Sequence, residues 1–467
     1  MSSQASSWEI LAAAKRVRTL DRIPRKWRLS PADLERAAKQ QDLTGFFIQQ
    51  FLGPDDIATI SKNTIAHQIN NCLHEIFFDQ ALERARYLDE YFATKKITIG
   101  PLHGLPINLK DPFHVKGVDT TIGYAHQVES QITTDLLSLG TVLYCKTNVS
   151  QGLILGETKN NMNGQTLNPH SHHNLSCGGS GGSGALLALG GSSLGVATDI
   201  GGSVCNPAAF NGVFGLKPTP ERAYHTNTYR SAVGFLSTSL AGLELALRST
   251  LSAQPWLRDP AVVPIPLPPA LRPHPPIYRG LKMVAEAVKQ AGHKVVDWTP
   301  PAHSRAVAIH LDLTGEPLLQ PKAALRPPSS LLEYQAATLE SLAYEAKYSD
   351  YWNSTANEDA PHAAVIPGKF YHIGYCQAIN VLNYSSAVIP VTKAEKHLDA
   401  GSGSGLSSSY EPLSPIDKLN WDAYDAEKYH GGPVGVQVVA RKFEEEKVLA
   451  IAGIVAEELR AYDGGRG

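Results

Sequence analysis

The most constraining feature of this chain is a Gly- and Ser-rich stretch at residues 176–218, which reads SCGGSGGSGALLALGGSSLGVATDIGGSVCNPAAFNGVFGLKP. Because glycine has no Cβ, such a stretch lets backbone N–H groups come close to a bound ligand. Residues 185–190 are predicted to form a short buried helix and residues 194–198 a strand. Ser203 follows this strand on a Gly-Gly turn, where an exposed nucleophile with amide donors beside it is expected.

Two more residues stand out elsewhere in the chain. Ser180 lies in the glycine run at residues 178–182, and Lys110 ends a predicted apolar strand at residues 105–109. A lysine after a strand is by itself usually a solvated surface charge. A role for Lys110 is therefore inferred only together with the segments around Ser180 and Ser203.

Together, these segments resemble the amidase-signature family of serine hydrolases. The family pattern is G-G-S-S-G-G, then T-D-x-G-G-S-[IV]-R-x-P-A-A, then G-[LF]-K-P, and its second and third parts stand almost intact at residues 198–209 and 215–218. The resemblance extends from Trp8 to about Leu459 and is closest to the acetamidase-like branch. It implies an α/β protein with the amidase-signature fold, a central mixed β-sheet covered on both faces by helices.

The resemblance implies a Ser-Ser-Lys triad with Ser203 as nucleophile, Ser180 as the bridging serine and Lys110 as the base. A lysine acts as a base only when neutral, so burial must lower its pKa from about 10.4. Ser180 would relay the proton to the leaving amine. The substrate would be bound by Ser180 and by the N–H groups that hold the oxyanion, those of Ile200, Gly201, Gly202 and Ser203.

The chain departs from the family pattern at several points. One serine of the family's pair is missing, so either Ser180 keeps the bridging role in a shortened loop or Ser183 takes it. The Arg expected two residues after the nucleophile is Cys205, which we expect to be a small buried residue. In the family that Arg is expected to pair with Asp199, so Asp199 is predicted to lack its partner and the catalyst to be weakened. Several short segments are also expected to be missing relative to the family.

Composition and charge restrict the class of protein. The 467 residues are 43% hydrophobic and 18% charged, enough for a large core. A net charge of −2 argues against nucleic acid or an anionic membrane surface as the main partner. No apolar run reaches the ~20 residues of a membrane span, and residues 1–7 lack a basic-then-apolar signal. Five scattered cysteines suit a reducing compartment, so a cytoplasmic protein is expected.

We expect residues 1–95 to form a helical N-terminal region packed on an α/β core at residues 96–467, in a single large domain overall. Two helices are predicted within residues 57–95 and a closing helix at residues 443–460. Further strands are predicted at residues 141–146, 388–391 and 434–439.

Two other motifs, a dinucleotide-binding pattern and a cluster of histidines, are weighed and set aside on their sequence context. Residues 179–184 satisfy G-x-G-x-x-G, but residues 171–176 are too polar for the buried strand that a dinucleotide site requires. His170, His172 and His173 are near neighbours, yet histidines in a polar loop are usually solvated. No cofactor and no metal are therefore predicted.

The predicted function is hydrolysis of a carboxamide to a carboxylate and ammonia or an amine through an acyl-serine intermediate. The predicted partner is a small-molecule amide, and a homodimer stays open. Two alternatives also stay open: a catalytically impaired amidase-like protein, and a biosynthetic member that transfers the acyl group to an amine.

Overall fold

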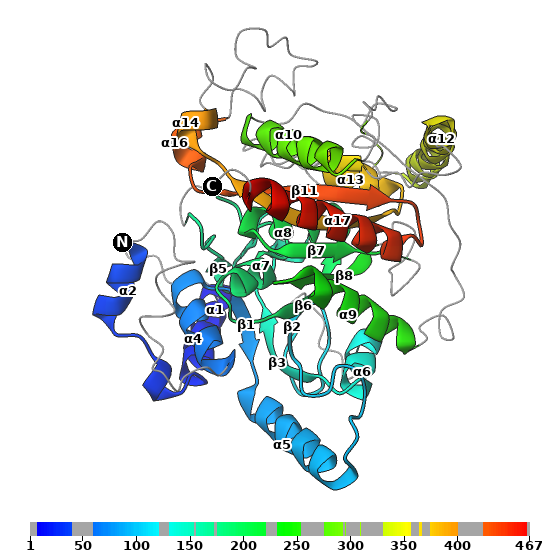
Figure 1. Cartoon of the computed structure of the whole chain (residues 1–467). Helices are drawn as coiled ribbons and strands as arrows, with labels where there is room; N and C mark the ends of the chain where they lie inside the picture. The colour runs from blue at the N-terminus through cyan, green and yellow to red at the C-terminus, as the bar shows by residue number, and fades with distance from the viewer. Residues whose placement is uncertain are drawn as a thin grey trace. The chain divides into compact units, whose positions relative to one another are not determined.

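The structure is a computed structural model that describes residues 7–39, 59–120, 130–153, 156–171, 175–220, 231–253, 275–292, 295, 309, 330–355, 364–366, 374–399 and 424–464. Its contacts divide the chain into two compact units. Unit 1 holds Met1–Ala197 and Phe235–Pro255, and unit 2 holds Thr198–Gly234 and Trp256–Gly467. Figure 1 labels the elements of both units.

Unit 1 contains a mixed set of strands with neighbours in the order β1 (Leu73–Ile76), β3 (Val142–Thr147), β2 (Pro106–Lys110) and β6 (Leu194–Asp199). The last two residues of β6, Thr198 and Asp199, belong to unit 2. Strand β2 runs parallel to β3 and β6, whereas β1 is antiparallel to β3. In the β2–β3 ladder, Lys110 lies opposite Thr147. Since side chains alternate between the two faces of a strand, Lys110 and Thr147 share one face of these strands.

Helices cover the strands of unit 1. They are α1 (Ser7–Asp21), α2 (Pro31–Ala38), α4 (Thr59–Asn70), α5 (Phe78–Lys95), α6 (Gln131–Ser138), α7 (Gly181–Ala188) and α9 (Leu240–Ser252). Helix α1 packs on β1, α5 on β3, and α7 on both β2 and α4. Helix α7 therefore brings the Gly- and Ser-rich stretch against the strand that ends in Lys110.

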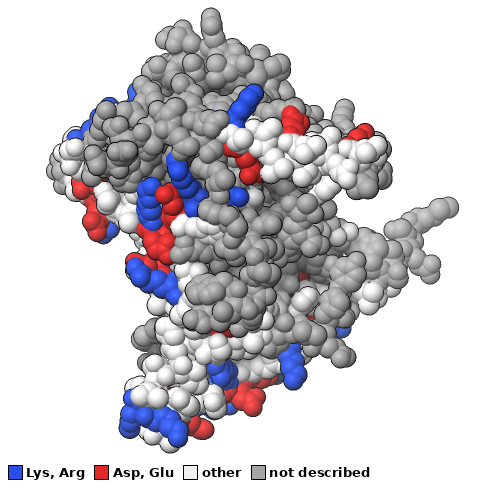
Figure 2. Space-filling view, turned by 90° about the vertical axis from the view of Figure 1, so that its right-hand side faces the viewer, with Lys and Arg blue, Asp and Glu red and all other residues white. Residues whose placement is uncertain are grey.

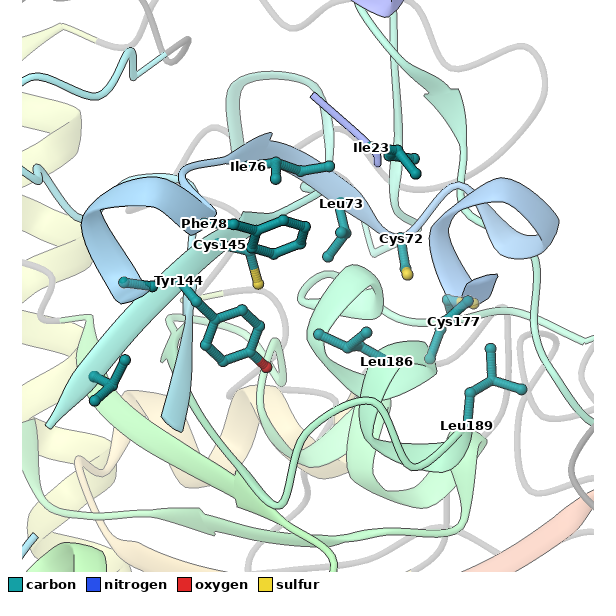
Figure 3. Close-up of a cluster of buried hydrophobic side chains, with 14 of the residues drawn as sticks. Ile23, Cys72, Leu73, Ile76, Phe78, Tyr144, Cys145, Cys177, Leu186 and Leu189 are labelled. Atoms are coloured by element: carbon teal, nitrogen blue, oxygen red, sulfur yellow. The ribbon is translucent and has the colours of Figure 1, made fainter. Parts of the chain in front are cut away.

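The core of unit 1 gathers around α7 and the strands β1 and β3 (Figure 3). The labelled side chains are Ile23, Cys72, Leu73, Ile76, Phe78, Tyr144, Cys145, Cys177, Leu186 and Leu189. The first turn of α7 approaches neighbouring backbone closely, because a Cβ on Gly182 would lie 2.5–2.6 Å from backbone atoms of Asn148 and Cys72. Glycine at position 182 is thus required for packing.

Unit 2 contains antiparallel strands with neighbours in the order β7 (Phe214–Lys217), β10 (Ser385–Lys393), β11 (Pro433–Ala440) and β9 (Ala364–Ile366). Its longer helices are α8 (Cys205–Asn211), α10 (Pro275–Gln290), α12 (Leu331–Thr355), α13 (Gly374–Val381) and α17 (Glu445–Gly464). A Cβ on Gly435 of β11 would meet Ala209 of α8, whereas Gly280 of α10 lies against the adjacent Val434. Because adjacent strand residues point to opposite faces, α8 and α10 cover opposite faces of β11.

Most of the predicted elements are confirmed. The strands at 141–146, 194–198, 388–391 and 434–439 are found as β3, β6, β10 and β11, and the closing helix as α17. The helix predicted at 185–190 is α7, which begins at Gly181. The two helices within 57–95 are α4 and α5, but strand β1 between them was not predicted. The boundary between residues 95 and 96 falls inside unit 1, and the domain division stays a prediction.

The described surface carries charges of both signs. On the face shown in Figure 2, Lys and Arg atoms stand next to Asp and Glu atoms. Oppositely charged side chains also form ion pairs, such as Lys396 with Glu427 (3.0 Å) and Arg248 with Glu244 (2.8 Å). Among the helices in the described part of the chain, none is long and apolar enough to cross a membrane.

The packing of α7 predicts a strong effect of shortening Leu186, which is fully buried in the core of unit 1. Leu186→Ala should lower the free energy of unfolding by about 2–5 kcal/mol, because it removes buried methyl groups and leaves a cavity. Leu82→Ala on α5, where the leucine is 42% exposed, is the control and should change little. Equal shifts of the two midpoints in urea unfolding would contradict this role of α7.

Candidate active site

One group of candidate residues lies in unit 1, at the end of β2. Lys110 is the last residue of this strand, and its side chain is only 2% exposed. Its ladder partner Thr147 has its Oγ1 atom 2.8 Å from the Oγ atom of Ser183, which stands in α7. Thr147 is therefore paired with Lys110 across the strands and hydrogen-bonded to Ser183, one of the two candidate bridging serines.

The glycine run before α7 is bound by the side chain of Thr158. Its hydroxyl donates to the carbonyl oxygen of Gly178 (2.6 Å) and accepts the N–H group of Gly181 (2.8 Å). Ser180 lies between these two glycines and is fully buried. Gly178 has φ +80°, a conformation that favours glycine. Both Ser180 and Ser183 are thus placed by α7, and the choice between them stays open.

A buried charged cluster, which the sequence did not reveal, lies on the other side of the same strands. Lys146 precedes Thr147 in β3, so its side chain points to the face opposite Lys110. Its Nζ atom is 3.1 Å from Asp111 Oδ1, and that carboxylate oxygen is 3.7 Å from His74 Nε2. Burial lowers the pKa of Lys146 and lowers that of His74 to about 4. The sequence signal was a lysine within the buried strand VLYCKT.

Another group of candidate residues lies in unit 2, in the loop between β6 and α8. Its centre is the carboxylate of Asp199. Oδ1 accepts the N–H group of Gly202 (2.7 Å) and an Nδ2–H of Asn380 (2.8 Å). Oδ2 accepts the N–H groups of Val204 (2.7 Å) and Cys205 (3.2 Å). The prediction that Asp199 lacks a partner is therefore wrong, because backbone groups and an amide take the place of the guanidinium.

The loop requires glycine at position 202. Gly202 has φ +109°, and a Cβ there would lie 2.7 Å from Asn206 Nδ2 and from Cys376 Cβ. Its own N–H group donates to Asp199 Oδ1 (2.7 Å). The N–H groups of Ile200, Gly201 and Ser203, residues that are partly exposed, make no described bond to Asp199. These three are the better candidates for oxyanion donors.

Cys205 is buried at the start of α8, as expected for a small core residue. Its Sγ atom lies 3.4 Å from both Ser386 Oγ and Gln437 Nε2, and that Gln437 amide also donates to Ser386 (2.8 Å). A neutral polar cluster thus surrounds the position where the family pattern has Arg. The reason for expecting Cys205 to weaken the catalyst was the missing partner of Asp199, and that reason is removed.

Comparison with known proteins agrees with this sequence pattern and these elements. The family model for amidases matches residues 57–314. The chain is 35% identical to an acetamidase of Aspergillus oryzae, over 97% of this chain and 99% of the relative. It is also 35% identical to an acetamidase of Emericella nidulans, over 97% of this chain and 98% of the relative. The chain belongs to the amidase family.

The fold of this amidase is confirmed by solved structures. A fatty acid amide hydrolase superposes with a TM-score of 0.85 at 24% identity, covering 97% of this chain and 95% of that one. A structure described as an amidase gives a TM-score of 0.62 at 21% identity, with 96% and 99% covered. The predicted α/β amidase-signature fold is therefore correct, and the protein is an amide-hydrolysing enzyme.

The comparisons also bear on the missing segments. The alignment with the Aspergillus oryzae acetamidase spans 550 positions, more than the 467 residues of this amidase. The relative therefore carries residues that this amidase lacks, as the family pattern predicted.

The predicted residues fall into both units. Lys110 and Ser180 belong to unit 1, and residues 200–203 to unit 2. Of the three histidines weighed as metal ligands, His172 and His173 lie outside the described residues, and His170 is buried with its N–H group bonded to Asn168 Oδ1 (2.9 Å). Over the described ranges, no three His, Cys, Asp or Glu residues gather as a metal would require.

Two buried histidines of unit 1 predict how stability depends on pH. Burial lowers the pKa of His67 and of His74 from about 6.5 to about 4. As pH falls, the unfolded chain binds protons first, so this stability is complete above pH 6.5 and is lost between pH 6.5 and 4.

When the pH is lowered from 7 to 4.5, the free energy of unfolding should therefore fall by about 2 kcal/mol less in His67→Gln than in the parent protein. Urea unfolding at the two pH values measures this difference. His67 accepts the N–H group of Leu73 through Nδ1, and glutamine retains an acceptor there. An unchanged pH dependence in the variant would show that folding does not lower the pKa of His67.

Proposed function

We propose that this amidase hydrolyses a carboxamide through an acyl-serine intermediate, with Ser203 as nucleophile, Ser180 as bridging serine and Lys110 as base. The observation that carries the proposal is the loop around Ser203. Asp199 binds the N–H groups of Gly202, Val204 and Cys205 and leaves those of Ile200, Gly201 and Ser203 for a substrate oxygen. Preorganised donors of this kind stabilise the charge that develops during acyl transfer.

In the first half of the reaction, neutral Lys110 accepts a proton from Ser180, which takes one from Ser203. The Oγ atom of Ser203 attacks the amide carbon, and the carbonyl oxygen becomes an oxyanion bound by the free N–H groups. The C–N bond then breaks, the leaving nitrogen takes a proton from Ser180, and Ser180 takes one back from the Lys110 ammonium group. Water hydrolyses the acyl-serine in the second half and regenerates Ser203.

The position of Lys110 supports its assignment as base. Its side chain is buried at the end of a strand against which α7 packs. Burial favours the neutral amine over the ammonium ion, and only the neutral amine accepts a proton. The more exposed lysines of unit 1, such as Lys116, lack this property.

The substrate class follows from the relatives. Two relatives that match over nearly their whole length are named acetamidases, which supports a small aliphatic amide as substrate. A net charge of −2 supports a small molecule over nucleic acid as the partner. Five free, buried cysteines support a reducing compartment and a cytoplasmic location.

The purified protein should release ammonia from acetamide, and Ser203→Ala should release none above background. A fluorophosphonate probe should label the parent protein, and peptide mapping should place the label on Ser203. Label on Ser180 or Ser183 with Ser203 untouched would overturn the assignment. Acyl transfer to an added amine in preference to water would favour the biosynthetic alternative, and a folded protein with neither label nor turnover would favour the impaired one.

Lys110→Ala should abolish nearly all turnover while the far-UV circular dichroism stays unchanged, because no other group then accepts the proton. Lys116→Ala, at a more exposed lysine of the same unit, is the control and should keep normal turnover. Parallel Ser180→Ala and Ser183→Ala variants identify the bridging serine, which is the one whose loss removes turnover. Retention of a tenth of the rate by Lys110→Ala would assign the base elsewhere.

A further inference from the structure

We propose that Asn380 is a positioning residue that holds the loop of Ser203 in its catalytic conformation through Asp199. The proposal rests on the proposed function and concerns unit 2 alone. Asn380 lies in α13, and no local pattern connects it with Asp199, which is 181 residues away.

The contact is specific. Asn380 is 2% exposed, and its Nδ2 atom lies 2.8 Å from Asp199 Oδ1, the oxygen that also accepts the N–H group of Gly202. An ionised carboxylate only accepts hydrogen bonds, so the amide must present its nitrogen here. Among the described contacts of Asp199, the other three come from the loop and the start of α8. Asn380 alone ties the carboxylate to another element of the unit.

The other end of the Asn380 amide shows which of its atoms matters. Its Oδ1 atom is buried with no hydrogen-bond partner. Burying an unpaired carbonyl oxygen destabilises a protein, so packing alone favours an apolar side chain of the same size. Among the described contacts, the useful atom of Asn380 is therefore Nδ2, which donates to Asp199.

A second turn of α13 touches the same loop. Cys376 lies one turn before Asn380, and its Sγ atom donates to Asn206 Oδ1 at 3.1 Å. A Cβ on Gly202 would collide with Cys376. Helix α13 thus supports the loop by contact at Cys376 and fixes the direction of the carboxylate at Asn380.

The hydrogen bond from Asn380 matters because Asp199 orients the peptide group of Gly202, next to the proposed nucleophile Ser203. If the carboxylate turns, the N–H group of Gly202 turns with it, and Ser203 follows directly in the chain. A displacement of about 1 Å at a reacting centre can cost on the order of a hundredfold in rate. Removing the amide should therefore lower kcat more than it raises KM.

The first test compares two changes of amide to apolar side chain on the same helix. Asn380→Leu should lower kcat, and the rate of fluorophosphonate labelling at Ser203, by about 10- to 100-fold with KM changed less than threefold. Gln377→Leu is the matched control, because the Gln377 amide is fully buried and neither of its polar atoms has a partner. The control should keep both rates.

The second test uses Asn380→Asp, which faces Asp199 with a carboxyl group that donates only when protonated. Among the described residues, the thiols of Cys205 and Cys376 are ionisable groups close to Asp199, and Lys217 interacts with Cys376. The hydrogen bond with Cys205 and burial raise the pKa of Cys376, which stays a thiol. The labelling rate of Asn380→Asp relative to the parent should therefore rise as pH falls from 8 to 5. The relative rate of Asn380→Leu should stay flat.

The outcomes separate the two proposals. If the parent protein is labelled at Ser203 and Asn380→Leu reacts equally fast, the role of Asn380 is wrong and the proposed function stands. If Ser203 of the parent is never labelled, the proposed function fails, and the role of Asn380 fails with it. A pH-independent ratio for Asn380→Asp would also overturn the positioning role, even where Asn380→Leu is destabilised.

Discussion

The carboxylate of Asp199 is the interaction on which the proposed chemistry of unit 2 depends. It gathers three backbone N–H groups and one amide, so a loop that is rich in glycine adopts one conformation. Flexible glycines alone would lose entropy on ordering, and charge-assisted hydrogen bonds offset that cost. The same arrangement decides which amides remain for substrate, because the N–H group of Gly202 is already used.

In unit 1, a lysine and several polar hydroxyl groups are buried within a packed core. The glycines at the start of α7 allow close approach to the backbone of Cys72 and Asn148, and Thr158 satisfies the turn before the helix. The alternation of side chains along β2 and β3 separates Lys110 from the ion pair of Asp111 and Lys146. Lys110, which we propose as the base, and the ion pair of Asp111 and Lys146 thus occupy opposite faces of the same strands.

The sequence predicted the parts of the site that depend on local pattern. The strand before Ser203, the strand that ends in Lys110 and the turn residues are local features, and the structure contains them. It did not predict Asn380 or Thr158, since both act through contacts between segments far apart in the chain. The error at Asp199 has the same origin: the missing Arg is visible in the sequence, whereas the groups that replace it become neighbours only on folding.

The most direct test of the account is a crystal structure of the protein after reaction with a fluorophosphonate. The account predicts phosphorus on the Oγ atom of Ser203, with the phosphonyl oxygen within hydrogen-bond distance of the N–H groups of Ile200, Gly201 or Ser203. Gly202 should still donate to Asp199, and Asp199 should still be bonded to Asn380. An adduct on another serine, or a Gly202 N–H group turned from Asp199 to the phosphonyl oxygen, would contradict it.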